Sequence, residues 1–345
     1  MKTVSDTLLT RRCLLLSLSA LVARGAAAQP GKPSIRVRTF NHVTLSVSDP
    51  KRSLEFYQGL FGLPILARQG DNTISLGIGP GAHLALSRAA LTMKPHINHF
   101  CMTTDGFDPD RLLAVLAAHG VTKGSPDGGS MKAWVRMCSS DLSGSKEGTP
   151  ELYFRDPDGL LVQLQDTTYC GGSGFLGNVC PAAQSSAPKG RIAVNGLSHL
   201  TLAVSNRQRS MAFYQQLFAM PIQARQGATP LLAVGRGPQF IALGEGGTAN
   251  GATPGVFNVA HVCLTMEGFH PDKVLQALAD YGIKARGAGG PVGPLTAYVV
   301  MRMSDRGGAP EGTPELYFTD PDGIFIQLQD ATYCGGSGYL GNVCP

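Results

Sequence analysis

Two histidines and one glutamine recur at matching positions in the two halves of this 345-residue sequence. Each stands in a run of residues whose polar and apolar side chains alternate, which is typical of a half-buried β-strand. These residues are His42, His99 and Gln163 in the first half, and His199, His261 and Gln327 in the second. Imidazole nitrogens and amide oxygens bind divalent metal ions. The repeated pattern therefore favours a shared role such as metal binding, with a solvent-facing sheet or hydrogen-bonded histidines as the alternative.

A tyrosine and a glutamate precede each glutamine on another strand-like run. Tyr153 and Tyr317 could donate a hydrogen bond to a substrate oxygen, although a strand tyrosine can equally serve packing. Glu151 and Glu315 stand two residues before the tyrosines and therefore share their strand face. A glutamate directed into a site could act as a general base, but we expect these two to be exposed on the surface.

The chain after residue 38 is a tandem duplication. Residues 41–45 (NHVTL) correspond to residues 198–202 (SHLTL), and residues 151–159 (ELYFRDPDG) correspond to residues 315–323 (ELYFTDPDG). The offset between matching residues drifts from 157 to 164 positions, so the repeat is far longer than that of a solenoid. The predicted parts are a first domain at residues 39–181, a linker at 182–196 and a second domain at 197–345.

Each half divides again into two segments with the same order of expected elements. Residues 42–47 alternate between polar and apolar side chains, and Asp49 with Pro50 provides an N-cap and a first-turn proline for a helix. The order restarts at His99, and a second helix follows Asp108. The other strands expected in the first half are residues 65–67, 73–78, 83–87, 133–138, 151–155 and 160–165. The chain is thus expected to contain four βαβββ modules and to be of the α+β class.

These modules, the strand-one histidines and the Asp-Pro-Asp-Gly turns resemble the vicinal oxygen chelate superfamily. Its members include glyoxalase I, extradiol ring-cleaving dioxygenases and bleomycin resistance proteins. The resemblance covers about residues 39–166 and 197–330. It implies that pairs of modules curl into two cup-shaped domains, each around one divalent metal ion. It also implies that the two histidines and the glutamine of each half are the ligands.

Among the subfamilies, the residues resemble the extradiol dioxygenase signature most. That signature runs Leu-Tyr, two residues, Asp-Pro, one residue and Gly, and a ligand glutamate follows it. In this sequence Gln163 and Gln327 replace the glutamate, and the signature's upstream histidine has no match in either half. A neutral amide does not offset the charge of a metal ion as a carboxylate does, so we expect weaker metal binding. His83 lies near the position where a fourth ligand would be expected, but Ile241 replaces it in the second half.

The resemblance implies a divalent-metal enzyme that acts on a small aromatic or vicinal-oxygen substrate. We expect a dioxygenase-like oxidoreductase with Fe(II), and Zn, Mn or Ni are alternative ions. The alternative functions are a metal-dependent lyase or isomerase of glyoxalase type and a non-catalytic protein that binds a small drug or metabolite. Because four modules can complete two cups within one chain, a monomer can hold both sites.

The charge of the sequence argues against a nucleic-acid-binding protein. The formal net charge is +5, and the first 28 residues contribute +3 of it, because they contain four Lys and Arg residues and one Asp. The rest of the chain carries only +2, so no strongly basic surface is expected.

The first 28 residues predict an export signal. Arg11 and Arg12 stand directly before an apolar run that reaches about Val22, and alanines at 26–28 offer a cleavage site. The arginine pair resembles a twin-arginine signal, with a plain secretory signal as the alternative. We therefore expect a periplasmic or secreted protein that is not attached to a membrane after the signal is removed.

Cysteine spacing agrees with an oxidising compartment. Cys170 and Cys180 flank a glycine-rich loop, and Cys334 and Cys344 flank its copy in the second half. In an exported protein such pairs are expected to form disulfide bonds. The alternative is a metal or redox site, but no histidine or CxxC motif accompanies these cysteines.

Overall fold

The computed structural model describes residues 34–185, 189–247, 249–287 and 292–345. The expected export signal at residues 1–28 lies outside these described residues. Within them, each half of the chain forms one nine-stranded sheet with two α-helices and one short 3-10 helix. The fold is therefore of the α+β class and contains the four expected βαβββ modules.

The first half begins with a long strand and contains both modules in sequence. Its elements are β1 (Val37–Val47), α1 (Pro50–Phe61), β2 (Ile65–Gln69), β3 (Thr73–Gly79), β4 (Ala82–Arg88), β5 (His96–Thr104), α2 (Pro109–Ala118), β6 (Thr122–Lys123), β7 (Lys132–Cys138), η1 (Ser140–Leu142), β8 (Thr149–Arg155) and β9 (Leu161–Asp166). The helices α1 and α2 start at Pro50 and Pro109, each directly after the expected capping aspartate. Asp49 caps α1 by accepting hydrogen bonds from the backbone N–H groups of Lys51 and Arg52.

The second half repeats the same order of elements. They are β10 (Gly196–Val204), α3 (Arg207–Phe218), β11 (Ile222–Gln226), β12 (Thr229–Ala233), β13 (Phe240–Glu245), β14 (Asn258–Met266), α4 (Pro271–Asp280), β15 (Lys284–Ala285), β16 (Thr296–Arg302), η2 (Ser304–Arg306), β17 (Thr313–Thr319) and β18 (Phe325–Asp330).

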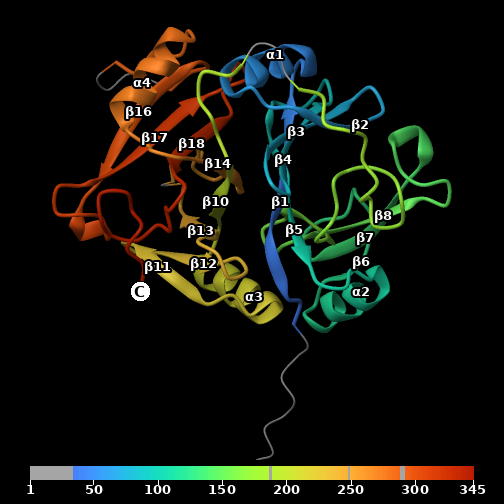
Figure 1. The fold of residues 1–345 in the computed structure, drawn as a ribbon. Coiled ribbons are helices and arrows are strands. Elements are labelled where there is room, and N and C mark those ends of the chain that lie inside the picture. The colour runs from blue at the N-terminus through green and yellow to red at the C-terminus, as the bar shows by residue number, and fades with distance from the viewer. Residues whose placement is uncertain (1–33, 186–188, 248, 288–291) are drawn as a thin grey trace, which may run out of the picture. The chain divides into compact units, whose positions relative to one another are not determined.

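The first strands of the two modules lie side by side at the centre of each sheet. The strand order is β2-β3-β4-β1-β5-β9-β8-β7-β6 in the first half and β11-β12-β13-β10-β14-β18-β17-β16-β15 in the second. In Figure 1 the first sheet runs from blue to green and the second from yellow to red. β1 is antiparallel to β5, and β5 is parallel to β9. This order brings the three strands that carry His42, His99 and Gln163 next to one another.

Alternation along β1 divides its side chains between a core and a cavity. Val43 and Leu45 are fully buried and belong to an apolar core that includes Tyr57 of α1. His42 and Thr44, on the opposite face, line a cavity. Helix α1 packs on β3 and β4, and α2 packs on β6, β7 and β8. Burial of one strand face thus fixes which residues face the cavity.

The Asp-Pro-Asp-Gly turn of each half contacts the first helix of the other half. The hydroxyl of Tyr214 in α3 donates to Asp156 Oδ2 at 3.1 Å, and that of Tyr57 in α1 donates to Asp320 Oδ2 at 3.0 Å. Burial raises the pKa of Asp156 and of Asp320 to about 6. Two ion pairs cross the same contact, Arg52–Asp322 and Arg209–Asp158. The turns are therefore structural elements that join the two halves.

Asparagine at position 156 is expected to remove part of the pH dependence of stability. An aspartate in an unfolded chain has a pKa of about 3.9, whereas the pKa of Asp156 in the folded protein is about 6. The folded state thus holds the proton more tightly. Protonation of Asp156 therefore stabilises the folded state fully below about pH 4, and this stabilisation is lost as the pH rises through about 6. Relative to the wild type, the free energy of unfolding of Asp156→Asn should therefore improve by about 2 kcal/mol between pH 4 and pH 7.

Urea denaturation over this pH range measures the effect. Asp71→Asn, at an exposed turn position, is the matched control and should follow the wild type. Parallel pH profiles for Asp156→Asn and the wild type would contradict the prediction.

Both expected disulfide bonds are present. They join Cys170 to Cys180 and Cys334 to Cys344. The other cysteines of the described residues, Cys101, Cys138 and Cys263, are buried and not disulfide-bonded.

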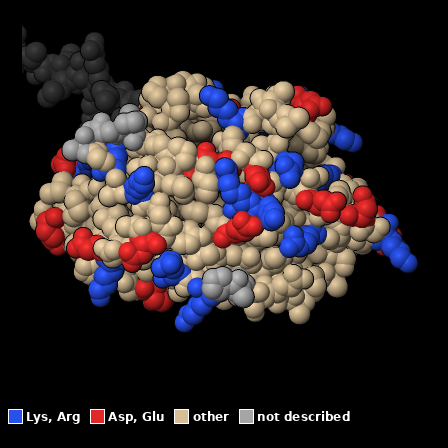
Figure 2. Space-filling view, turned by 90° about the horizontal axis from the view of Figure 1, so that it is seen from above, with Lys and Arg blue, Asp and Glu red and all other residues tan. Residues whose placement is uncertain are grey.

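The exposed surface carries charges of both signs. On the face shown in Figure 2, Lys and Arg side chains are interspersed with Asp and Glu side chains. Among the described residues, none of the helices has the length and apolar character needed to cross a membrane.

Candidate metal centre

The predicted ligands of the first half converge on one point. His42 Nε2 lies 3.0 Å from Gln163 Oε1, His99 Nε2 lies 3.1 Å from the same oxygen, and the two nitrogens are 3.4 Å apart. Donor atoms that bind one metal ion at about 2.0–2.2 Å are themselves separated by about 3.0–3.4 Å in octahedral or tetrahedral geometry. The three atoms, which we call the donor triangle, therefore have the spacing of one face of a metal site.

Two asparagines decide which ring nitrogen of each histidine carries the hydrogen. Asn41 Nδ2 donates to the carbonyl oxygen of Tyr169 at 2.9 Å, so its Oδ1 faces His42 Nδ1 at 2.7 Å. Asn98 Oδ1 likewise lies 2.8 Å from His99 Nδ1. Because an amide oxygen only accepts hydrogen bonds, Nδ1 carries the hydrogen in both rings. Each Nε2 therefore presents a lone pair to the donor triangle.

The donor triangle is uncharged and lacks a hydrogen between its atoms. Burial, together with the neighbouring imidazoles of His83 and His99, holds the pKa of His42 well below its usual range. Burial also lowers the pKa of His99 to about 4. The amide nitrogen of Gln163 is buried and has no hydrogen-bond partner among the described residues. Three lone pairs at this spacing repel one another unless a cation lies between them, so the residues fit a divalent metal ion.

The second half repeats this arrangement. His199 Nε2 lies 3.0 Å from Gln327 Oε1, and the rings of His199 and His261 are 5.6 Å apart between centroids. His261 Nδ1 donates to the backbone carbonyl of Asn250 at 2.7 Å, and burial lowers the pKa of His261 to about 4. Among the described residues no group of three His, Cys, Asp or Glu has metal-binding spacing, so a metal site here would need the glutamine as its third donor.

His83 stacks on His42 and does not add a donor atom to the donor triangle. Its ring lies parallel to that of His42, with centroids 4.6 Å apart. The register pairs His42 with His83 and His199 with Phe240, so the counterpart of His83 is Phe240. The expectation that Ile241 takes this place was wrong by one residue. A shift of one residue along a strand exchanges the two faces, and Ile241 is a fully buried core residue.

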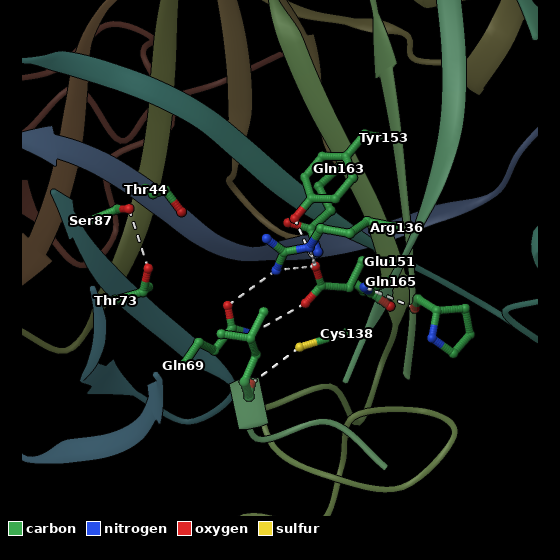
Figure 3. A network of polar contacts seen from close by, with 12 residues as sticks. Thr44, Gln69, Thr73, Ser87, Arg136, Cys138, Glu151, Tyr153, Gln163 and Gln165 are labelled. Carbon is green, nitrogen blue, oxygen red and sulfur yellow. Dashed lines mark hydrogen bonds and ion pairs between the residues drawn. The ribbon is translucent and has the colours of Figure 1, made fainter. Parts of the chain in front are cut away.

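Glu151 is the centre of a hydrogen-bonded network beside the donor triangle (Figure 3). Its Oε2 accepts hydrogen bonds from Arg136 Nε at 2.7 Å and from the Tyr153 hydroxyl at 3.0 Å. Its Oε1 accepts from the Tyr169 hydroxyl at 2.8 Å and from Gln69 Nε2 at 3.2 Å. The expected surface exposure was wrong, because only 1% of Glu151 is accessible. The network compensates the burial of the charge.

Glu315 is buried in a matching network, which corrects the same expectation. It accepts hydrogen bonds from Arg302 Nε at 2.7 Å and from the Tyr317 and Tyr333 hydroxyls, each at 3.2 Å. The ring of Tyr317 also lies edge-on to that of His261, at 5.3 Å between centroids. Each predicted tyrosine thus lies between a candidate ligand histidine and a glutamate.

Sequence analysis missed the arginines and the second tyrosine of these networks. Tyr169 and its copy stand in the duplicated YCGGSG motif, so the duplication could have signalled them. The arginines gave no such signal. Arg136 pairs with Glu151 in the register of β7 and β8, whereas Val300 takes that place opposite Glu315.

Loss of Arg302 is expected to destabilise the protein more than loss of Arg136. The Arg302 side chain is 1% exposed, so Arg302→Met leaves Glu315 with an uncompensated buried charge. Such a loss costs about 3–5 kcal/mol. Arg136 is 45% exposed, so water can replace part of its interaction in Arg136→Met. Chemical denaturation of both variants measures the difference, and equal losses would contradict it.

One family model matches both repeats of the sequence. The sequence matches the model of the Glyoxalase/Bleomycin resistance protein/Dioxygenase superfamily over residues 39–164 and 196–328. The chain belongs to this superfamily. The two matched segments correspond to the two sheets, which confirms the resemblance inferred from the modules and the turns. No curated protein matches the sequence.

Solved structures share the fold of this superfamily member at low identity. A Mn(II)-bound glyoxalase from Novosphingobium aromaticivorans is 20% identical with a TM-score of 0.57, over 85% of this chain and 82% of that one. An extradiol ring-cleaving dioxygenase from B. fuscum is 15% identical with a TM-score of 0.56, over 90% and 75%. A halotolerant catechol dioxygenase is 16% identical with a TM-score of 0.55, over 88% and 87%. These identities show a shared fold and leave the reaction open.

Proposed function

We propose that this protein is a divalent-metal-dependent enzyme that acts on a small substrate carrying two adjacent oxygens. The observation that supports the proposal most is the donor triangle of His42, His99 and Gln163, with sides of 3.0, 3.1 and 3.4 Å. Its lone pairs are directed by Asn41 and Asn98. All three ligands also line the cavity, so a bound ion is reachable by substrate.

The residues around the donor triangle would have different roles at the site. When bound, a divalent ion supplies Lewis-acid binding of adjacent substrate oxygens. The Tyr153 hydroxyl already donates to Glu151, so it can accept a hydrogen bond from a substrate hydroxyl and orient it. Glu151 receives four hydrogen bonds and holds Tyr153 and Arg136 in position. In the second half Tyr317 likewise donates to Glu315, which Arg302 and Tyr333 also contact.

For the reaction, we propose dioxygenase-like oxidation with Fe(II). The duplicated signature around Tyr153 and Tyr317 supports it, because it resembles that of extradiol dioxygenases. Three protein donors on one face also leave positions for both substrate and dioxygen, as in non-haem iron oxygenases.

A glyoxalase-type isomerase or lyase is the second candidate. Its support is the neutral donor triangle, because two imidazoles and an amide leave the full charge of a divalent ion available to polarise substrate oxygens. Zn, Mn or Ni could serve in such a reaction as well as Fe(II).

Metal analysis and oxygen uptake separate the candidates. Purified protein is reconstituted with each of the four ions, and bound metal is measured before substrates are added. Stoichiometric iron with oxygen uptake on catechols supports the dioxygenase. Metal-dependent turnover without oxygen uptake supports the isomerase or lyase. A protein that binds small molecules but no metal contradicts both and leaves the non-catalytic binding protein.

We also propose export through the twin-arginine route. The two disulfide bonds support export, because disulfides persist in oxidising compartments. The pair Arg11 and Arg12 before an apolar run supports the twin-arginine route. The test is cell fractionation of the full chain beside a variant with Arg11→Lys and Arg12→Lys. Export of the wild type and retention of the variant in the cytoplasm are expected. Unchanged export of the variant would indicate a plain secretory signal instead.

A further inference from the structure

The two cavities over the donor triangles differ in size. The first has a volume of about 390 Å³ and the second about 150 Å³. Both are lined by the two histidines, the glutamine, the tyrosine and the glutamate of their half. The difference therefore comes from the residues around this shared set.

One wall of the first cavity carries hydroxyl groups that the second lacks. Ser46, Ser75 and Ser87 line the first cavity. Figure 3 shows Ser87 beside Thr73 and Thr44, and the Thr73 hydroxyl donates to Ser87 Oγ at 3.2 Å. The strand registers match the three serines to Ala203, Leu231 and Gly244, in that order. The first wall can therefore form hydrogen bonds with a hydrophilic substrate that the second wall cannot form.

The cations around the two cavities also differ. The first cavity is lined by two arginines and one glutamate, and the second by one arginine and one glutamate. Arg88 lies exposed at the end of β4, where the register places Glu245 in the second half. Arg136 lines the first cavity, and Val300 has its place in the second, where Arg306 lines the cavity from another position. The first cavity therefore favours an anion.

A longer loop contributes to the lining of the second cavity. Twelve residues (246–257) connect β13 to β14, whereas seven residues (89–95) connect β4 to β5. Asn250 of the longer loop lines the second cavity. Its backbone oxygen accepts a hydrogen bond from His261 Nδ1 at 2.7 Å, and its side-chain oxygen accepts one from the Tyr298 hydroxyl at 3.2 Å. The longer loop is thus held against His261 and Tyr298, whereas Ala90 and Met93 of the shorter loop line the larger first cavity.

We propose that the first cavity alone binds substrate, and that this substrate is a small anion rich in hydroxyl or carboxylate oxygens. The inference rests on the proposed function, because the metal ion would hold the adjacent oxygens of that anion. Arg88 contacts its negative charge, and the serine wall binds its hydroxyl groups. The second half binds metal, but its loop takes the place of substrate.

Calorimetric titration of the metal-loaded full-length protein tests this inference. The probe is gluconate, an anion with adjacent oxygens, and catechol is the neutral aromatic comparison. Bound metal is measured first in each sample. We expect two metal ions but one gluconate per chain, and tighter binding of gluconate than of catechol.

Matched variants assign the binding to the first cavity. Arg88→Glu introduces the residue that the second half has at that position, and Ser87→Gly does the same on the serine wall. The expected loss of gluconate affinity is at least about tenfold for Arg88→Glu and about threefold for Ser87→Gly, with metal content unchanged. Glu245→Arg is the control in the second half and should leave gluconate binding unchanged.

The outcomes distinguish this inference from the proposed function. Failure of the wild type to bind metal overturns the proposed function. A metal-loaded protein that binds no gluconate, binds two per chain, or binds it equally well in Arg88→Glu overturns this inference alone. Tighter binding of catechol that does not depend on Arg88 also overturns the assignment of an anionic substrate.

Discussion

Replacement of both His42 and His199 by alanine is expected to leave the protein without bound metal. Each change removes one corner of a donor triangle, and His42 lies within 3.4 Å of both other donors in its half. Loss of an outer hydrogen-bond partner already weakens metal affinity by about 10–100-fold, so loss of a ligand should cost at least about 100-fold. The wild type should bind two ions per chain, each single variant one, and the double variant none. Metal analysis after dialysis gives these counts.

The control for this series is His270→Ala. His270 is exposed and its side chain makes no capping hydrogen bond at the start of α4, so two ions should remain. Two ions in the double variant would place the metal elsewhere. No metal in the wild type would indicate that each glutamine turns its amide group over and donates to a histidine.

Replacement of Gln163 by glutamate is expected to tighten metal binding relative to the wild type and to destabilise the metal-free protein. The amide nitrogen that becomes an oxygen has no partner among the described residues, so the change breaks no hydrogen bond there. The added negative charge attracts a divalent ion across a short distance in a buried site, and we expect at least about tenfold tighter binding. Without the ion, residue 163, which is 1% exposed as glutamine, carries a buried charge beside two neutral imidazoles. That charge should cost several kcal/mol of stability.

Gln165→Glu is the matched control for this prediction. Gln165 is fully buried two residues further along β9, and its amide donates to the carbonyl of Pro150, so it lies outside the donor triangle. This variant should lose stability without any gain in metal affinity. Competition with a chelator measures the affinity, and thermal unfolding with and without metal measures the stability. Weaker metal binding in Gln163→Glu, or a more stable metal-free form, would contradict the assignment of Gln163 as a ligand.

The sequence by itself determined the modules and the candidate ligands. The duplication was visible in motifs such as ELYF, and alternation along residues 42–47 already separated His42 from the core residues. Proline after an N-capping aspartate marked the starts of α1 and α2. These features are local, because helix caps and strand alternation depend on neighbouring residues alone.

Tertiary structure decided what the candidate residues can do. Asn41 directs the lone pair of His42 only because the carbonyl of Tyr169, 128 residues away in the chain, accepts from its amide. Glu151 is buried because Arg136 and Tyr169, from other segments of the chain, compensate its charge together with the neighbouring Tyr153. The counterpart of His83 is Phe240 because strand register, and not residue count across a loop, sets which side chains face the cavity. Register, burial and hydrogen bonding between distant segments are not local, so only the folded chain could reveal two similar donor triangles beneath two different cavities.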